Sequence, residues 1–284
     1  MTKYTFKEFQ TEYPDDGACL DRIMQVQYGG TQFSCPACGA DSKFSRIAKR
    51  RAYACQWCGH HVYPCVDTIF EKSSTKLTVW FFVMYMMTST RHGVAAKEIQ
   101  RQTGVTYKCA WRICDQLWKL MAVADDQSPL SGHIEVDETY VGGRKRRVPG
   151  DKKVERDGII RAGTVPDVKQ TTLEPIVLTN VQRGSIVSTD ELRTYSDLAN
   201  APYQHGTVNH CADEFARDIH HVNTLEGHWA RLKLSMRGTH VHVSSKHLWR
   251  YVSEFSYRRN FRHSHNDVFN RLVASFSLPV PQET

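Results

Sequence analysis

Two pairs of cysteines constrain the fold of this chain more than any other feature. Cys35 and Cys38 form one Cys-x-x-Cys pair, Cys55 and Cys58 form a second, and sixteen residues separate the pairs. A glycine follows each pair and permits the tight turn that directs both thiolates to one ion. The spacing predicts a zinc ribbon with a structural Zn²⁺. The competing interpretation is a redox-active dithiol, which two matched pairs fit less well than a single pair.

Length and charge favour a nucleic-acid-binding protein with several domains. The 284 residues suffice for two or three small domains, and the net charge of +7 is spread through several segments. This positive charge favours binding to polyanions such as nucleic acid. The alternative is a basic protein whose charge only keeps it soluble. The N-terminus lacks the apolar segment of a signal peptide, and no run reaches the ~20 apolar residues of a membrane helix. We therefore expect an intracellular protein without membrane contact.

The chain separates into a helical and zinc-binding part and a strand-rich part. A polar segment with proline and glycine, residues 125–132, marks the boundary between them. The expected regions are an N-terminal helical segment, the zinc ribbon, further helices and one α/β domain, at residues 1–30, 31–70, 71–124 and 125–284. Within the last region, alternating or β-branched residues predict strands at 133–141, 158–165 and 185–190. Helical patterns follow at 171–181, 212–236 and 248–262.

Two helical periods that meet at Gly104 resemble a helix-turn-helix motif. The first covers residues 94–105 and the second covers residues 106–121. In such a motif the second helix enters the major groove of DNA, where it would present Tyr107, Lys108 and Arg112 to bases or phosphates. A helical hairpin that does not bind DNA has the same pattern, so this alternative stays open.

Acidic residues occur in three separated segments of the strand-rich part. Asp137 follows alternating apolar residues in IEVDETYVGG, and Asp190 ends the strand pattern IVSTD. Glu226 lies in a helical segment, 35 residues separate it from Asp190, and Lys233 follows it by seven. A two-metal site cleaves phosphodiesters by activating water at one cation and stabilising the leaving oxygen at the other. The three carboxylates therefore predict a Mg²⁺ or Mn²⁺ site, with Lys233 holding a DNA phosphate. Any one of them alone is more often a surface residue.

Two further basic segments predict contacts with DNA. One is a loop that would bind phosphates without reading sequence, or else a solvated turn; it contains Arg144, Lys145, Arg146 and Arg147. The other is the terminal helix, in which aromatic residues alternate with arginines and predict an aromatic packing face and a basic DNA face. The arginines of that face are Arg250, Arg258 and Arg259.

The motifs together extend from Cys35 to about Arg262. They are the zinc ribbon, EVDETYVGG, STDE, VNH at 208–210, HVNTLEGHWARLK and SSKHLWRYVSEFSYRRNFR. In these motifs the chain resembles an insertion-sequence transposase of the IS1595 family, with its ISXO2-like catalytic domain. The resemblance implies an α+β multidomain protein whose RNase H-like α/β domain is built on a mixed sheet. It implies Mg²⁺-dependent cleavage at terminal inverted repeats and joining of the freed 3′ hydroxyls to target DNA.

The same resemblance implies partners and a cellular location. The partner would be double-stranded DNA, bound by a homodimer or a larger assembly because two ends are processed together. The location would be the bacterial cytoplasm, in association with the nucleoid.

The identity of the third metal ligand stays open in the sequence. Members of the family carry asparagine or glutamate there, and Asn223 lies three residues before Glu226. We favour Glu226, because a carboxylate binds Mg²⁺ more strongly than an amide, with Asn223 orienting a metal or a phosphate. Histidines surround this position and would contact DNA or the metal-bound water, or have structural roles. They are His220, His221 and His228.

The segment after the first strand departs from the family pattern. Relatives carry a longer basic hairpin and an apolar second strand, whereas GGRKRRVPGDKKVERDGIIRAG passes almost directly to the next strand. We therefore expect the second strand to be shortened or missing, which would leave the strand of Asp137 less supported. The alternative function is then a catalytically inactive or repurposed DNA-binding protein derived from a transposase. A metal-dependent nuclease that cuts branched DNA without joining it is a further alternative.

Overall fold

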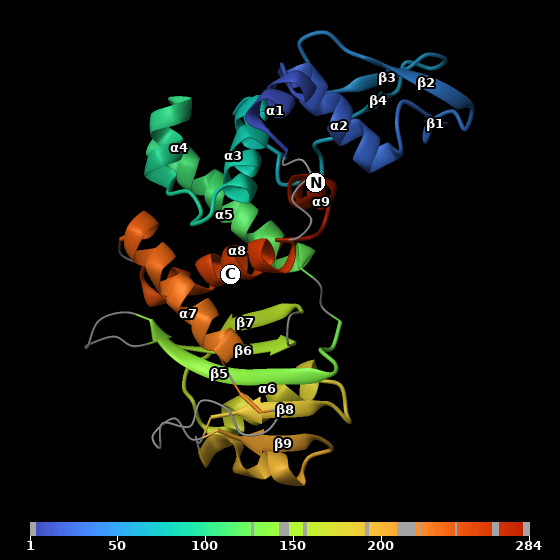
Figure 1. Cartoon of the computed structure of the whole chain (residues 1–284). Helices are drawn as coiled ribbons and strands as arrows, with labels where there is room; N and C mark the ends of the chain where they lie inside the picture. The colour runs from blue at the N-terminus through green and yellow to red at the C-terminus, as the bar shows by residue number, and fades with distance from the viewer. Residues whose placement is uncertain are drawn as a thin grey trace. The chain divides into compact units, whose positions relative to one another are not determined.

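The structure is a computed structural model, in which the chain forms two compact units (Figure 1). We call residues 1–90, 96–124 and 264–284 the ribbon unit, and residues 91–95 and 125–263 the sheet unit. The structure describes residues 4–125, 128–141, 148–155, 158–190, 193–208, 220–221, 223–241, 243–262 and 267–280. In residues 148–155 it describes the backbone alone.

An aromatic cluster holds the helices of the ribbon unit together. Helix α1 (Phe6–Glu12) begins at Thr5 with a reciprocal capping box to Glu8, and α2 (Asp16–Tyr28) begins at the Asp15 cap. Phe9 stacks on Tyr85 of α3 (Leu77–Ser89) and meets the ring of Phe269 edge-on. Phe269 belongs to α9 (Asp267–Ala274), which packs on α3 and α5. The C-terminal helix thus belongs to the ribbon unit, whereas the sequence had suggested one domain from 125 to 284.

The zinc ribbon is confirmed as a small antiparallel sheet. Its strands are β1 (Gln32–Ser34), β2 (Asp41–Arg46), β3 (Tyr53–Cys55) and β4 (His61–Val62), in that order. The predicted helical pair follows α3 as α4 (Ala96–Thr103) and α5 (Tyr107–Ala124). Gly104 lies between them with φ of 71°, a left-handed conformation that suits glycine at the end of a helix.

A five-stranded mixed sheet forms the centre of the sheet unit, in the order β7-β6-β5-β8-β9 (Figure 1). The strands are β5 (His133–Val141), β6 (Val148–Glu155), β7 (Ile160–Thr164), β8 (Ile186–Thr189) and β9 (Gln204–Thr207). Strands β5, β6 and β7 pair antiparallel, and β8 and β9 add parallel to β5. Three antiparallel strands followed by two parallel ones are the RNase H-like arrangement that the family resemblance implied.

Helical segments cover both faces of this sheet. Ile134, Val136 and Val187 pack on one face against α6 (Gln170–Asn180) and the 3₁₀ segment η1 (Arg193–Asn200). Trp229 and Leu232 on the other face belong to α7 (Asn223–Ser235), which packs with α8 (Leu248–Asn260). The π-helical turn η3 (Met236–His240) and the 3₁₀ turn η4 (Ser245–His247) connect α7 and α8. Because side chains alternate along β5, residues 133, 135, 137 and 139 face α7.

The expectation of a missing or shortened second strand is wrong. Strand β6 spans eight residues and pairs with β5 from Ile134↔Glu155 to Val141↔Val148. It also pairs with β7 on its other side, so it lies inside the sheet. Its sequence, VPGDKKVE, does not predict a strand, because proline, glycine and charged residues replace the usual apolar alternation. Strand β5 is therefore supported on both sides, which removes the structural argument for an inactive protein.

Candidate functional site

Three acidic side chains gather where β8 ends beside the middle of β5. Strand β5 pairs with β8 up to Val136↔Thr189, so Asp137 and Asp190 are the next residues in register. Carboxylate oxygens of Asp137, Glu138 and Asp190 lie within 4.8 Å of one another, and each residue is partly exposed. In sheets of this kind the carboxyl ends of parallel strands are where ligands bind. The group is a candidate centre for divalent cations, since it offers oxygen ligands alone.

The close packing of these acids changes their electrostatics. Burial and the neighbouring Asp190 raise the pKa of the Asp137 carboxyl to about 7, and Glu226 adds to this effect. The Glu138 amide and the Trp229 side chain lower the pKa of the Asp137 carboxyl and so act in the opposite sense. Like charges this close resist full ionisation unless a cation lies between them, because each carboxylate raises the pKa of its neighbour. The arrangement is thus suited to a divalent cation.

Glu138 is a candidate that sequence reasoning missed. Its neighbour Asp137 faces α7, and strict alternation places Glu138 on the opposite face of β5. Nevertheless its carboxylate belongs to the same group as those of Asp137 and Asp190, beside the point where β8 ends at Thr189. The adjacent acidic pair in IEVDETYVGG was the one available signal for this residue.

Glu226 and Lys233 lie on α7, which packs across β5. Glu226 is exposed near the N-terminus of the helix and acts on Asp137 through its charge, outside the close group of three. Lys233 is half-buried and follows seven residues later, close to two helical turns. Asn223 is the first residue of α7, and its side chain lies outside the described residues. The choice between Asn223 and Glu226 as a metal ligand stays a prediction.

The three histidines near this helix contact protein groups. His228 is 2% exposed, and its ring meets Phe255 edge-on at 4.8 Å between centroids. His220 Nδ1 lies 2.8 Å from the Ser188 hydroxyl, and His221 Nδ1 lies 3.1 Å from a Glu135 carboxylate oxygen. These contacts support the structural reading that the sequence left open.

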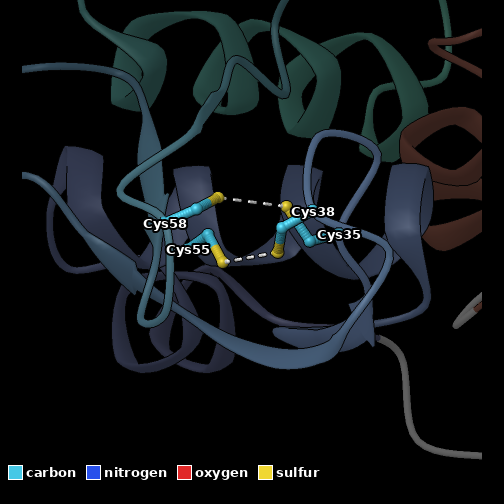
Figure 2. A group of neighbouring side chains, drawn as sticks. All are labelled: Cys35, Cys38, Cys55 and Cys58. Atoms are coloured by element: carbon cyan, nitrogen blue, oxygen red, sulfur yellow. Dashed lines mark hydrogen bonds between the residues drawn. The ribbon is translucent and has the colours of Figure 1, made fainter.

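The four cysteines of the ribbon form a second group of ligand atoms (Figure 2). The sulfurs of Cys35 and Cys58 are 3.7 Å apart, and those of Cys38 and Cys55 are 4.0 Å apart. A tetrahedral site with Zn–S bonds of 2.3 Å requires sulfurs about 3.8 Å apart. The cluster therefore fits a structural Zn²⁺, and a dithiol that cycles through a disulfide is the poorer interpretation.

Both cysteine knuckles have the same backbone geometry. The Gly39 amide donates to the Cys35 carbonyl at 2.8 Å, and the Gly59 amide donates to the Cys55 carbonyl at 3.0 Å. Both glycines have positive φ, 71° and 73°. Burial raises the pKa of the Cys55 thiol, but hydrogen bonds from Ser42 and from the Cys58 and Trp57 amides outweigh it, so that the pKa falls to about 6. A thiolate at Cys55 is the form that binds zinc.

The residues predicted to contact DNA differ in their exposure. At the start of α5, Tyr107 is 51% exposed, and Lys108 and Arg112 are exposed as well, so their role in DNA binding stays a prediction. The basic loop with Arg144, Lys145, Arg146 and Arg147 lies outside the described residues.

The basic DNA face predicted for the terminal helix is wrong at Arg250. Its side chain is 2% exposed, lies over the Trp249 ring and donates to His247 Nδ1 at 2.6 Å. The side chain of Arg258 is 10% exposed and pairs with the buried Glu254 at 3.5 Å. Residues 250, 254 and 258 recur every four positions, so their shared helical face points inward. Arg259 is partly exposed and keeps its predicted role as an expectation.

A search of the described residues found no helix with the length and apolar character that a membrane span requires.

Comparisons with known proteins match both units of the chain. The description "ISXO2-like transposase domain" fits residues 129–260, and "Transposase zinc-ribbon domain" fits residues 14–61. The chain is 28% identical over 254 residues to an uncharacterized protein in transposable element ISH50 of Halobacterium salinarum, covering 79% of this chain and 84% of that protein. It is 30% identical over 96 residues to an uncharacterized transposase-like protein of Haemophilus influenzae, covering 34% of this chain and 76% of that protein.

One solved structure is similar at a low level. It is a chain of the simian T-cell lymphotropic virus intasome in complex with PP2A regulatory subunit B56 gamma. The TM-score is 0.32 and the identity 10%, over 62% of this chain and 65% of that chain. A score this low adds nothing to the assignment of the fold.

Proposed function

This chain belongs to the IS1595 family of transposases, and we propose that it cleaves DNA at the ends of an insertion sequence and joins the freed 3′ ends to target DNA. Membership follows from the two matched domains, from a relative in a transposable element and from a transposase-like relative. The observation that carries the proposed reaction is the meeting of Asp137 and Glu138 of β5 with Asp190, which directly follows the parallel strand β8.

The acidic group would hold two divalent cations, Mg²⁺ or Mn²⁺. Asp137, Glu138 and Asp190 supply closely spaced oxygen ligands, and Glu226 lies near enough to act on Asp137 through its charge. Bound cations would supply charge stabilisation for the attacking and leaving oxygens of the phosphodiester.

Residues on α7 would bind the scissile strand. Lys233 lies close to two helical turns after Glu226, so its ammonium group can hold a phosphate beside the carboxylates. Asn223, at the start of the same helix, would orient a phosphate or a metal ligand. Water would act as the nucleophile in cleavage and a 3′ hydroxyl in joining, so neither step requires a covalent bond to the protein.

The ribbon unit would recognise the inverted repeats. Tyr107, Lys108 and Arg112 are exposed together at the N-terminus of α5, where the second helix of such a motif meets the major groove. Zinc would stabilise the ribbon without taking part in chemistry. Because two ends are cut and joined together, we propose a dimer or a larger assembly on DNA.

The test is a cleavage and joining assay with the full chain. Double-stranded DNA with the repeats that flank the gene is incubated with Mg²⁺ and a second DNA, and labelled 3′ ends are followed. Asp137→Asn and Asp190→Asn are compared with the control variant Glu174→Gln. This control also removes one carboxylate, but from α6, which packs on the opposite face of the sheet.

Each outcome separates the proposal from one alternative. The proposal is supported if the native chain and Glu174→Gln both cleave and join DNA while both aspartate variants do neither. Cleavage without joining identifies a nuclease. Repeat binding by a folded native chain that never cleaves identifies a DNA-binding protein that lacks catalysis.

A further inference from the structure

A buried glutamate lies on the same strand face as Asp137. Glu135 is 0% exposed, and alternation along β5 directs its side chain and that of Asp137 toward α7. Charged side chains are almost never fully buried unless they are paired. Glu135 does not belong to the close group of Asp137, Glu138 and Asp190, so the metal site does not account for its burial.

Both carboxylate oxygens of Glu135 contact the segment that begins α7. Oε2 accepts a hydrogen bond from the Leu225 amide at 3.2 Å, and Oε1 lies 3.1 Å from His221 Nδ1. Leu225 is the third residue of α7, so its N–H is one of those that the first helical turn leaves without an intrahelical partner. A carboxylate is also favoured at this end of a helix by the backbone dipoles.

A second contact attaches the same segment to the neighbouring strands. Glu135 pairs in register with Ser188 of β8, and the Ser188 hydroxyl lies 2.8 Å from His220 Nδ1. Ser188 in turn pairs with Gly206 of β9, where an added Cβ would lie 2.4 Å from the His220 ring. The entry to α7 is thus attached to β5 through His221 and Leu225, and to β8 and β9 through His220.

We propose that Glu135 is a positioning residue that sets α7 against the acidic site. Glu226 directly follows the anchored Leu225, and the side chains of Glu226 and of Trp229, one turn later, both influence the Asp137 carboxyl. The carboxylate of Glu135 therefore fixes the helix whose side chains complete the site, without touching the reacting atoms. This inference rests on the proposed function for its consequence in catalysis, and on the contacts of Glu135 with His221 and Leu225 for its geometry.

Three variants distinguish the positioning of α7 by Glu135 from the effect of its negative charge and from a general loss of protein stability. Glu135→Ala removes the anchor, whereas Glu135→Gln keeps an acceptor oxygen for the Leu225 amide but removes the charge. Val136→Ala is the matched control, because it removes buried atoms from the next residue of β5 on the face that packs against α6. All variants are compared as full chains at a temperature where circular dichroism shows each one folded.

Two readouts do not require activity. Amide hydrogen exchange of residues 223–226 is expected to accelerate at least about tenfold in Glu135→Ala, because the Leu225 amide loses its hydrogen-bond acceptor. Titration with Mn²⁺ alone is expected to show affinity weakened about tenfold in Glu135→Ala and restored by Glu135→Gln, because glutamine keeps the geometry. Val136→Ala should leave both quantities within about twofold of the native values.

Cleavage is the third readout, and it distinguishes the two proposals. If the native chain cleaves, Glu135→Ala should lower the rate at saturating Mg²⁺ at least about tenfold, with unchanged DNA affinity and recovery in Glu135→Gln. If the native chain does not cleave, the proposed function fails, and the exchange and Mn²⁺ measurements still decide the role of Glu135. Exchange and Mn²⁺ affinity in Glu135→Ala equal to those of Val136→Ala would overturn it.

Discussion

Asp137 and Asp190 are brought together by strand register, at the first position beyond the last pair of β5 and β8, Val136↔Thr189. The two strands are parallel, so residues in register lie side by side, and the carboxylate oxygens of Asp137 and Asp190 lie within 4.8 Å of each other. Their separation is therefore fixed by backbone pairing and not by flexible loops. A site on paired strands holds its ligands more accurately than a site on loops.

Glu138 is expected to contribute to cation binding as strongly as its two neighbours. Its carboxylate belongs to the close group, so Glu138→Gln should weaken Mn²⁺ binding at least about tenfold, or ~1.4 kcal/mol. Isothermal titration of the full chain with Mn²⁺ measures this affinity. Glu174→Gln on α6 is the matched control and should bind Mn²⁺ as the native chain does. Equal affinities in Glu138→Gln and the control would exclude Glu138 from the site.

The ribbon is expected to unfold without its metal. Cys58→Ser removes one of four ligands, and structural zinc sites contribute on the order of 10 kcal/mol to folding in small domains. Zinc content by atomic absorption should fall well below one ion per chain, and trypsin should cut within residues 31–70. Cys109→Ser is the control, since this half-buried thiol lies 3.2 Å from the Thr75 hydroxyl, outside the cluster. Full zinc content in Cys58→Ser would contradict the four-cysteine site.

Lys108 and Arg112 are expected to contribute phosphate contacts. Removal of either side chain should lower the slope of log affinity against log salt by about 0.9, the value for one lost phosphate contact on duplex DNA. Fluorescence anisotropy with repeat DNA at several salt concentrations gives this slope. Lys169→Ala removes an equally exposed cation that pairs with Asp167 and serves as the control. Slopes unchanged in both α5 variants would show that this helix end does not bind the DNA backbone.

Local patterns were sufficient for much of the fold. The paired cysteines predicted the ribbon, the glycine between two helical periods predicted α4 and α5, and β-branched residues ending in Asp190 predicted β8. In each case the signal lies within a few consecutive residues. Such signals can be read from the sequence because one face of each element must be apolar or must bind an ion.

Features that depend on distant neighbours were not predictable in this way. Strand β6 exists because β5 and β7 pair with it on either side, although its own residues favour a turn. Arg250 is buried beside Trp249 and His247, an environment that its helical period alone does not reveal. Glu138 joins the acidic group only because Asp190, distant in sequence, lies beside β5 at the end of β8. Each of these outcomes is decided by tertiary pairing, which the linear pattern does not contain.

The sheet unit is expected to lose stability in mild acid through His240. This ring meets Tyr251 edge-on at 4.5 Å between centroids. Burial, with a smaller effect of Arg258, lowers the pKa of His240 to about 4 from its usual 6.5. The folded state therefore disfavours the proton that the unfolded chain accepts. Stability from this residue is fully present above pH 6.5 and is lost as the pH falls from 6.5 to about 4. At 1.36 kcal/mol per pKa unit, discounted for partial exposure, the loss is roughly 1–3 kcal/mol.

Asp137 acts in the opposite sense over the same pH interval, so the native curve alone does not isolate His240. A carboxyl with a raised pKa binds its proton more tightly in the folded state, which favours folding as the pH falls below about 7. The informative quantity is the difference between the native chain and His240→Phe, which keeps an aromatic ring against Tyr251 but does not titrate. Urea unfolding without added divalent cation should show the variant losing less stability than the native chain between pH 7.5 and pH 5. Parallel curves for the two proteins would show that His240 is protonated in the folded state as readily as in the unfolded one.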